Sequence, residues 1–151
     1  MIIGFTGTRL GMTSKQRDSI EAILNFMKQL KEHEPEEVHH GDCVGADEQF
    51  HRMCQLRRLC IVIHPPDNES LRANCIGGVV LVPKPYLDRN EDIVNVSDIL
   101  FAAPKGSEQF QGSGTWQTIR RAKRWNRNVI IIHPEGGCEW RRGGSFESKK
   151  E

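Results

Sequence analysis

Short apolar runs alternate along this chain with longer stretches in which apolar residues recur every three or four positions. In the longer stretches, residues such as Ile20, Leu24 and Met27 return at helical spacing and form one apolar face. The short runs predict buried strands, and the longer stretches predict helices that cover them. The predicted strands are 1–6, 37–40, 60–63, 98–103 and 129–133. The predicted helices are 14–30, 46–58, 88–96 and 114–126.

Regular alternation of strand and helix favours an α/β fold with a doubly wound, mainly parallel five-stranded sheet in three layers, of the Rossmann-like kind. Thr13 and Gln16 match a capping box at the start of the first helix. Residues 65–90 are harder to interpret: 76–83 suit either a strand or a loop. We expect this excursion to lie over the mouth of a site, because long loops in compact domains are often functional.

The domain is expected over 1–134, and 135–151 is expected to be a loosely ordered C-terminal tail, because its composition turns to Gly, Arg, Ser and Lys. In all, 37% of the 151 residues are hydrophobic and 27% are charged, as in globular proteins. The chain begins directly with a strand and contains no apolar segment of membrane-spanning length. We therefore expect a cytoplasmic protein with no membrane partner.

The formal net charge of +1 gives no general reason to expect nucleic acid as a partner. The basic cluster over 120–127 is interpreted first as a solvated helix face, with binding of single-stranded nucleic acid as an alternative. Five cysteines without framework spacing indicate reduced thiols. The His, Cys and Asp residues over 39–54 lack the paired spacing of a zinc site, so neither a metal nor another cofactor is expected.

Three glycine-containing turns each connect a predicted strand to a predicted helix. They are Gly4-Phe5-Thr6-Gly7-Thr8-Arg9, Gly41-Asp42-Cys43-Val44-Gly45-Ala46-Asp47 and Gly112-Ser113-Gly114-Thr115. Glycine lets a ligand approach the backbone, and the first turn of a helix offers unpaired N–H groups to a phosphate. Because strand-to-helix connections of a parallel sheet lie at the same edge, we expect all three turns to form one site.

These turns, together with Arg89-Asn90 ahead of Ser97-Asp98-Ile99-Leu100, resemble the SLOG superfamily over roughly residues 1–133. This superfamily includes the DNA-processing protein A domain and the lonely-guy phosphoribohydrolases. The resemblance implies a Rossmann-like domain that holds a nucleotide or a nucleotide-derived molecule. In the hydrolase branch an arginine, matched here by Arg89, and a glutamate support cleavage of the N-glycosidic bond. This sequence has Thr118 at the position of the glutamate, and a threonine cannot stabilise oxocarbenium-like charge as a carboxylate does.

We therefore expect a sensor or sequestering protein for a phosphorylated, nucleotide-type ligand, with a nucleoside-monophosphate N-glycosidic hydrolase as the alternative. The residues expected at the ligand are Gly7, Thr8, Arg9, Gly41, Asp42, Gly45, Ala46, Asp47, Arg72, Arg89, Asn90, Gly112, Ser113, Gly114 and Thr115. If the protein is an enzyme, Arg89 with Asp42 or Asp47 would be catalytic. A homo-oligomer is expected from the superfamily and from Trp116 and Trp125, nine positions apart on one helix.

Overall fold

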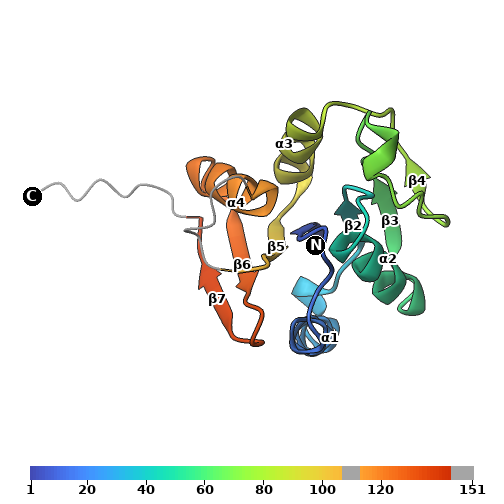
Figure 1. Cartoon of the computed structure of the whole chain (residues 1–151). Coiled ribbons are helices and arrows are strands. Elements are labelled where there is room, and N and C mark those ends of the chain that lie inside the picture. The colour runs from blue at the N-terminus through green and yellow to red at the C-terminus, as the bar shows by residue number, and fades with distance from the viewer. Residues whose placement is uncertain (107–112, 144–151) are drawn as a thin grey trace, which may run out of the picture.

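The computed structural model describes residues 1–106 and 113–143, and its centre is a single mixed β-sheet (Figure 1). In the described residues this sheet has seven strands, in the order β4-β3-β2-β1-β5-β6-β7, and only β7 is antiparallel to its neighbour. The strands are β1 (Ile2–Gly7), β2 (Glu37–His40), β3 (Cys60–Ile63), β4 (Val79–Val80), β5 (Ile99–Ala103), β6 (Asn128–Ile132) and β7 (Cys138–Arg141). The predicted doubly wound α/β fold is confirmed, with two strands more than expected.

Helices cover both faces of the sheet, which gives the three predicted layers (Figure 1). On one face, Ile20 and Leu24 of α1 and Phe50 of α2 pack against the sheet, and Phe50 stacks on Phe5 of β1 with ring centroids 4.2 Å apart. On the other face, α3 and α4 bury a separate apolar cluster. The helices are α1 (Ser14–Gln29), α2 (Ala46–Leu56), α3 (Tyr86–Val96) and α4 (Gly114–Arg124), with 3-10 turns at Lys31–His33 and Glu69–Leu71.

The order of the strands reverses between β1 and β5. From β1 the chain proceeds through β2, β3 and β4 in one direction, and from β5 it proceeds to β6 in the other. The connections that leave the carboxyl ends of β1 and β5 therefore diverge to opposite sides. In open parallel sheets this divergence opens a crevice in which ligands bind.

Two parts of the chain differ from the sequence-based prediction. Residues 76–83, which suited either a strand or a loop, contain the short edge strand β4. The expectation of a loose tail from residue 135 is wrong for Cys138–Arg141, which forms β7. The chain reverses at Gly136, whose φ of +93° favours glycine, and the exposed edge of β6 supplies backbone partners for the returning strand. The rest of the expected tail, 144–151, lies outside the described residues.

The capping box predicted at Thr13 is present, and it does more than begin α1. The Thr13 side chain accepts from the backbone N–H of Gln16, and the Gln16 side chain accepts from the backbone N–H of Thr13. Gln16 Nε2 also donates to the carbonyl oxygens of Pro104 and Ile132, each at 2.9 Å. A single buried amide thus joins α1 to the ends of β5 and β6. Among the described residues, no helix has both the length and the apolar character needed to cross a bilayer.

Candidate functional site

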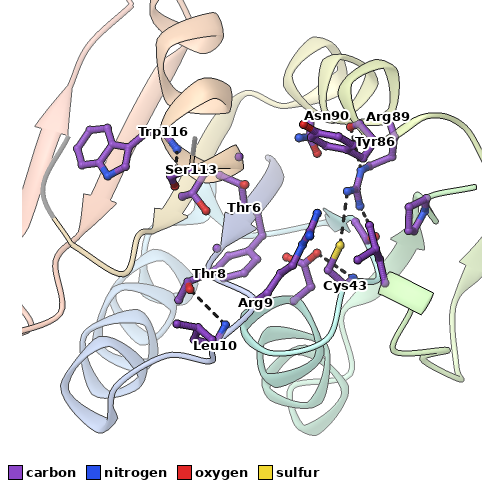
Figure 2. Close-up of a pocket in the computed structure, with 18 of the residues that line it drawn as sticks. Thr6, Thr8, Arg9, Leu10, Cys43, Tyr86, Arg89, Asn90, Ser113 and Trp116 are labelled. Atoms are coloured by element: carbon purple, nitrogen blue, oxygen red, sulfur yellow. Dashed lines mark hydrogen bonds between the residues drawn. The ribbon is translucent and has the colours of Figure 1, made fainter. Parts of the chain in front are cut away.

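A cavity of about 680 Å³ lies at the carboxyl ends of the central strands. Figure 2 shows Ser113 and Trp116 on one side of it and Tyr86, Arg89 and Asn90 on the other. The residues expected at the ligand that line this cavity are Gly7, Thr8, Arg9, Gly41, Asp47, Arg89, Asn90, Ser113, Gly114 and Thr115. Gly112 lies outside the described residues. The expected convergence of the three turns therefore occurs for residues taken from each of them.

One side of the cavity carries groups that suit an anion. Ser113 caps α4 by accepting from the N–H of Trp116 at 3.4 Å, and Gly114 and Thr115 form the first turn, where N–H groups have no helical acceptor. A Cβ added at Gly114 would meet nothing within 4 Å, so the space above the helix start is open. Arg9 and Lys105 add basic side chains to the same lining.

Glycine is required at two positions of the second turn. Gly45 has a φ of +91°, and a Cβ there would lie 2.3 Å from the carbonyl oxygen of Arg9. A Cβ at Gly41 would lie 1.8 Å from Arg89 Nη1. Ala46 donates its backbone N–H to the Thr8 carbonyl at 3.0 Å. Gly45 and Ala46 do not line the cavity; they hold the first and second turns against each other.

Arg89 is buried and lines the cavity. Its Nη1 donates to the carbonyl oxygens of Gly41 and His64, the latter at 3.3 Å, and its Nη2 lies 3.5 Å from Cys43 Sγ. These contacts join α3 to the segments that follow β2 and β3. The guanidinium therefore has a structural task in addition to any contact with a ligand.

Asp47 is the buried acidic group in the lining of the cavity. Its Oδ2 accepts from the backbone N–H of Cys43 at 3.1 Å, and burial raises the pKa of the Asp47 carboxyl to about 6, against the lowering influence of Arg89. A carboxyl group with a pKa near 6 can exchange protons close to neutral pH. Burial also raises the pKa of the Cys43 thiol, so this cysteine lines the cavity as a neutral group.

Asp42 and Arg72 were expected at the ligand, but neither lines the cavity. The Asp42 carboxylate is fully buried, and its Oδ2 accepts from Arg72 Nε at 3.0 Å. Its Oδ1 accepts from the backbone N–H of Cys75 at 2.9 Å. Both oxygens of Asp42 are therefore used to hold the segment after β3 against the second turn, and of the two acids proposed for catalysis the structure leaves Asp47 at the cavity.

Sequence reasoning missed several lining residues. The segment after β3 contributes Pro66, Asp67, Asn68 and Leu71. These residues belong to the excursion 65–90 that was expected over the mouth of the site, but none of them was predicted individually. Their position in the sequence could have identified them, because they follow the parallel strand β3 and therefore lie at the same edge of the sheet. Lys105 and Gly106 follow β5 and lie at this edge for the same reason. Trp116, interpreted as a core or subunit contact, is buried and donates its Nε1–H to the carbonyl of Gly106 at 3.1 Å while also lining the cavity.

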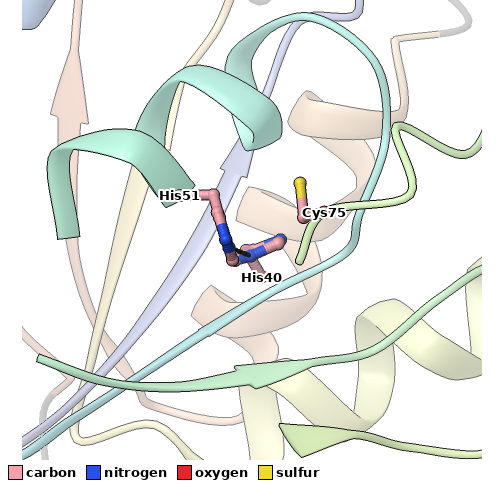
Figure 3. A group of neighbouring side chains, drawn as sticks. All are labelled: His40, His51 and Cys75. Carbon is pink, nitrogen blue, oxygen red and sulfur yellow. Dashed lines mark hydrogen bonds between the residues drawn. The ribbon is translucent and has the colours of Figure 1, made fainter. Parts of the chain in front are cut away.

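Beside the cavity, His40, His51 and Cys75 bring ligand-type atoms within 4.8 Å of one another (Figure 3). The two rings are already committed to hydrogen bonds. His40 Nδ1 accepts from the Asp42 backbone N–H at 3.0 Å, so its Nε2–H donates to His51 Nδ1 at 2.8 Å. The Nε2–H of His51 then donates to the carbonyl of Ile76 at 2.8 Å. Every ring nitrogen of the two histidines is used in these hydrogen bonds, and burial lowers the pKa of His40 to about 3, so the two rings form a buried hydrogen-bonded chain from Asp42 to Ile76.

Comparisons with known proteins bear on the fold. A solved structure, the X-ray structure of TM1055, a target of the Northeast Structural Genomics Consortium, superposes with a TM-score of 0.60. The match covers 90% of this chain and 76% of the other, at 18% sequence identity. The superposition shows a shared Rossmann-like α/β fold, and at this identity it shows the fold alone. A comparison with family models gives no match, and neither does a comparison with curated proteins.

Proposed function

We propose that the protein binds a phosphorylated, nucleotide-type ligand in the 680 Å³ cavity, as a sensor or sequestering protein of the SLOG kind. The observation that carries the proposal is that the start of α4 and the loop after β1 line the same cavity. The unpaired N–H groups and hydroxyls of Ser113, Gly114 and Thr115 would hold a phosphate, and Arg9 would neutralise it. The volume falls within the range of small-molecule sites.

The remainder of the cavity supplies groups for the rest of a nucleotide. Asp67 offers a carboxylate suited to ribose hydroxyls, and Asn90 offers a side-chain amide. Tyr86 offers an aromatic ring, over which the Arg9 guanidinium lies at 5.9 Å from the centroid. A base stacked on Tyr86 would have to displace Arg9 from the ring, which would free the guanidinium for the phosphate.

Isothermal titration calorimetry with the four ribonucleoside monophosphates and their parent nucleosides tests this proposal. We expect at least one monophosphate to bind, and its nucleoside to bind about tenfold or more weakly, because the site would be built around the phosphate. Native mass spectrometry of freshly purified protein would identify a retained nucleotide directly. Equal affinity for nucleoside and nucleotide, or no binding of any monophosphate, would contradict the proposal.

A nucleoside-monophosphate hydrolase is the second candidate, and the raised pKa of Asp47 favours it. Thr118 argues against the glutamate-dependent mechanism, since its Oγ1 donates to the Gly114 carbonyl at 2.8 Å and it does not line this cavity. Asp47 would then have to act as the acid–base group. Release of free base from a monophosphate, measured chromatographically and abolished by Asp47→Asn, would establish this reaction. Sustained release by the wild-type protein would also overturn a purely binding role.

A further inference from the structure

A second cavity, of about 330 Å³, lies between α3 and α4. Its lining is strongly basic, with Arg120, Arg121 and Arg124 joined by Gln117 and Thr118 of α4. Asn90 of α3 lines both this cavity and the larger one. The two cavities are therefore neighbours along α4: the larger one is at the helix start, and the smaller one follows the next turns.

The arginines lie on one face of α4 because positions 117, 120, 121 and 124 are three or four residues apart. Arg121 is held in place, since its Nη1 donates to Glu91 Oε2 at 3.2 Å and to the Leu87 carbonyl at 3.3 Å. Arg120 and Arg124 form no ion pair within the described ranges 1–106 and 113–143. Three arginines thus share this face, and the Glu91 carboxylate pairs with one of them. The remaining positive charge is an excess that an anion would neutralise.

The helix dipole gives a simpler reason for basic residues near the end of α4, since cations stabilise a helix C-terminus. That reason covers Arg121 and Arg124, which lie in the last turn, but not Arg120. It also leaves Gln117 unexplained, because the Oε1 of this residue is buried and has no donor partner in the described part of the chain. A ligand with both an anionic group and an N–H or O–H donor would satisfy the arginines and this amide together.

We propose that the α3–α4 cavity is a second phosphate subsite, and that the ligand is a 5′-phosphorylated dinucleotide or a molecule of that design. This inference rests on the proposed function, which places the first phosphate at the start of α4. Thr115 and Arg121 are six residues apart, which corresponds to about 9 Å along the helix axis. Neighbouring phosphates of a di- or triphosphate are too close together to span this distance. A sugar between the two phosphates, as in a dinucleotide, brings their spacing closer to this value.

The test compares nucleoside monophosphates with the matching 5′-phosphorylated dinucleotides by titration calorimetry, on the wild-type protein and on Arg120→Gln/Arg124→Gln. We expect the wild-type protein to bind the dinucleotide about tenfold or more tightly than the monophosphate. The double variant should lose this advantage and keep its affinity for the monophosphate within about twofold. The salt dependence of dinucleotide binding should also become shallower, by about 0.7 in the log–log slope for a lost phosphate contact.

Lys15→Gln/Arg17→Gln is the matched control, because it removes two positive charges from the exposed side of α1, on the opposite face of the sheet. An equal loss of dinucleotide affinity in this control would overturn the subsite. So would equal affinity of the wild-type protein for mono- and dinucleotide, which would leave the proposed function intact. Failure to bind either ligand would remove both proposals. Much tighter binding of a single-stranded decamer than of the dinucleotide would overturn the dinucleotide in favour of a nucleic-acid surface.

Discussion

Arg72 Nε lies 3.0 Å from Asp42 Oδ2, and this ion pair joins residues that are 30 positions apart in the chain. The Asp42 carboxylate is completely buried, and its other oxygen holds the backbone N–H of Cys75. The pair therefore fixes the segment after β3, which supplies Asp67 and Asn68 to the cavity, against the turn that follows β2. Asp42 therefore supports the site without lining the cavity.

We predict that Asp42→Ala lowers the free energy of unfolding by about 3 kcal/mol or more, because Arg72 and the Cys75 amide lose their buried acceptor. Urea denaturation would measure this loss. Asp42→Asn is the matched variant: it keeps an acceptor oxygen, and asparagine tolerates the φ of +55° found at this position, so its loss should be smaller. An Asp42→Ala protein of unchanged stability that no longer binds ligand would show that Asp42 contacts the ligand directly.

Gly114→Leu should block the ligand without harming the fold. Nothing lies within 4 Å of an added Cβ at this position, and leucine has a better helix propensity than glycine by about 1 kcal/mol. The longer side chain would occupy the space above the first turn of α4, where the phosphate is proposed to sit. We expect affinity for a nucleoside monophosphate to fall by more than about tenfold, measured calorimetrically, with no loss of thermal stability.

Gly137→Leu provides the control for this prediction. Gly137 lies in the turn before β7, and the nearest atom to an added Cβ there is Glu135 Oε1 at 3.6 Å. This substitution adds the same side chain away from the cavity and should leave the affinity unchanged. If Gly114→Leu binds the nucleotide as well as Gly137→Leu does, the phosphate does not occupy the start of α4.

Two buried histidines, His40 and His64, predict loss of stability in acid. Burial lowers the pKa of His40 to about 3 and that of His64 to about 4. Because unfolded histidines titrate near 6.5, the unfolded chain binds more protons below that pH. The stabilising contribution is therefore complete above pH 6.5 and is lost as the pH falls toward 4. Each histidine lowers the free energy of unfolding by up to about 1.4 kcal/mol for every pH unit of acidification in this range. Asp47, whose pKa is raised to about 6, binds its proton more readily in the folded state, so between pH 6 and 4 it offsets the loss of stability caused by one of these histidines.

Urea denaturation at pH 7.5, 6.5, 5.5 and 4.5 would measure this dependence. His64→Gln should reduce the slope, because one titrating group is removed from the folded interior. His33→Gln is the control, since His33 is exposed on the 3-10 turn after α1. A stability that is flat from pH 7.5 to 4.5 would contradict the lowered pKa values of His40 and His64.

The sequence predicts the parts of the site that depend on local chain order. Thr8, Asp47 and Ser113 each lie in the connection from a parallel strand to the next helix or in the first turn of that helix, so an α/β alternation is enough to bring them to one edge. The partnership of Asp42 with Arg72 is different, because it depends on how the segment after β3 folds back, and no local pattern encodes that path. An aspartate in a loop gives the same sequence pattern whether its carboxylate binds a ligand or pairs with a buried arginine.

The edge strand β7 was also beyond local prediction, whereas β4 at the other edge falls within 76–83, which the sequence left open as a strand or a loop. β7 has four residues and does not form an apolar run. In β7 the glutamate, tryptophan and arginine give no clear alternation, and Trp140 is 55% exposed. What makes this segment a strand is the open edge of β6, with which Trp140 pairs opposite Ile130. Such pairing is a tertiary effect, and composition alone favours a tail.

Arg89→Lys should reveal that this arginine supports the cavity. Arginine reaches the carbonyl oxygens of Gly41 and His64 with one nitrogen and Cys43 Sγ with another, whereas lysine has a single ammonium group. We expect the free energy of unfolding to fall by about 1–3 kcal/mol, the usual cost of an unsatisfied buried polar group. Arg52→Lys, on the exposed side of α2, should change it by less than about 0.5 kcal/mol. If Arg89→Lys kept full stability but lost nucleotide binding, the guanidinium would be a ligand contact rather than a support for the site.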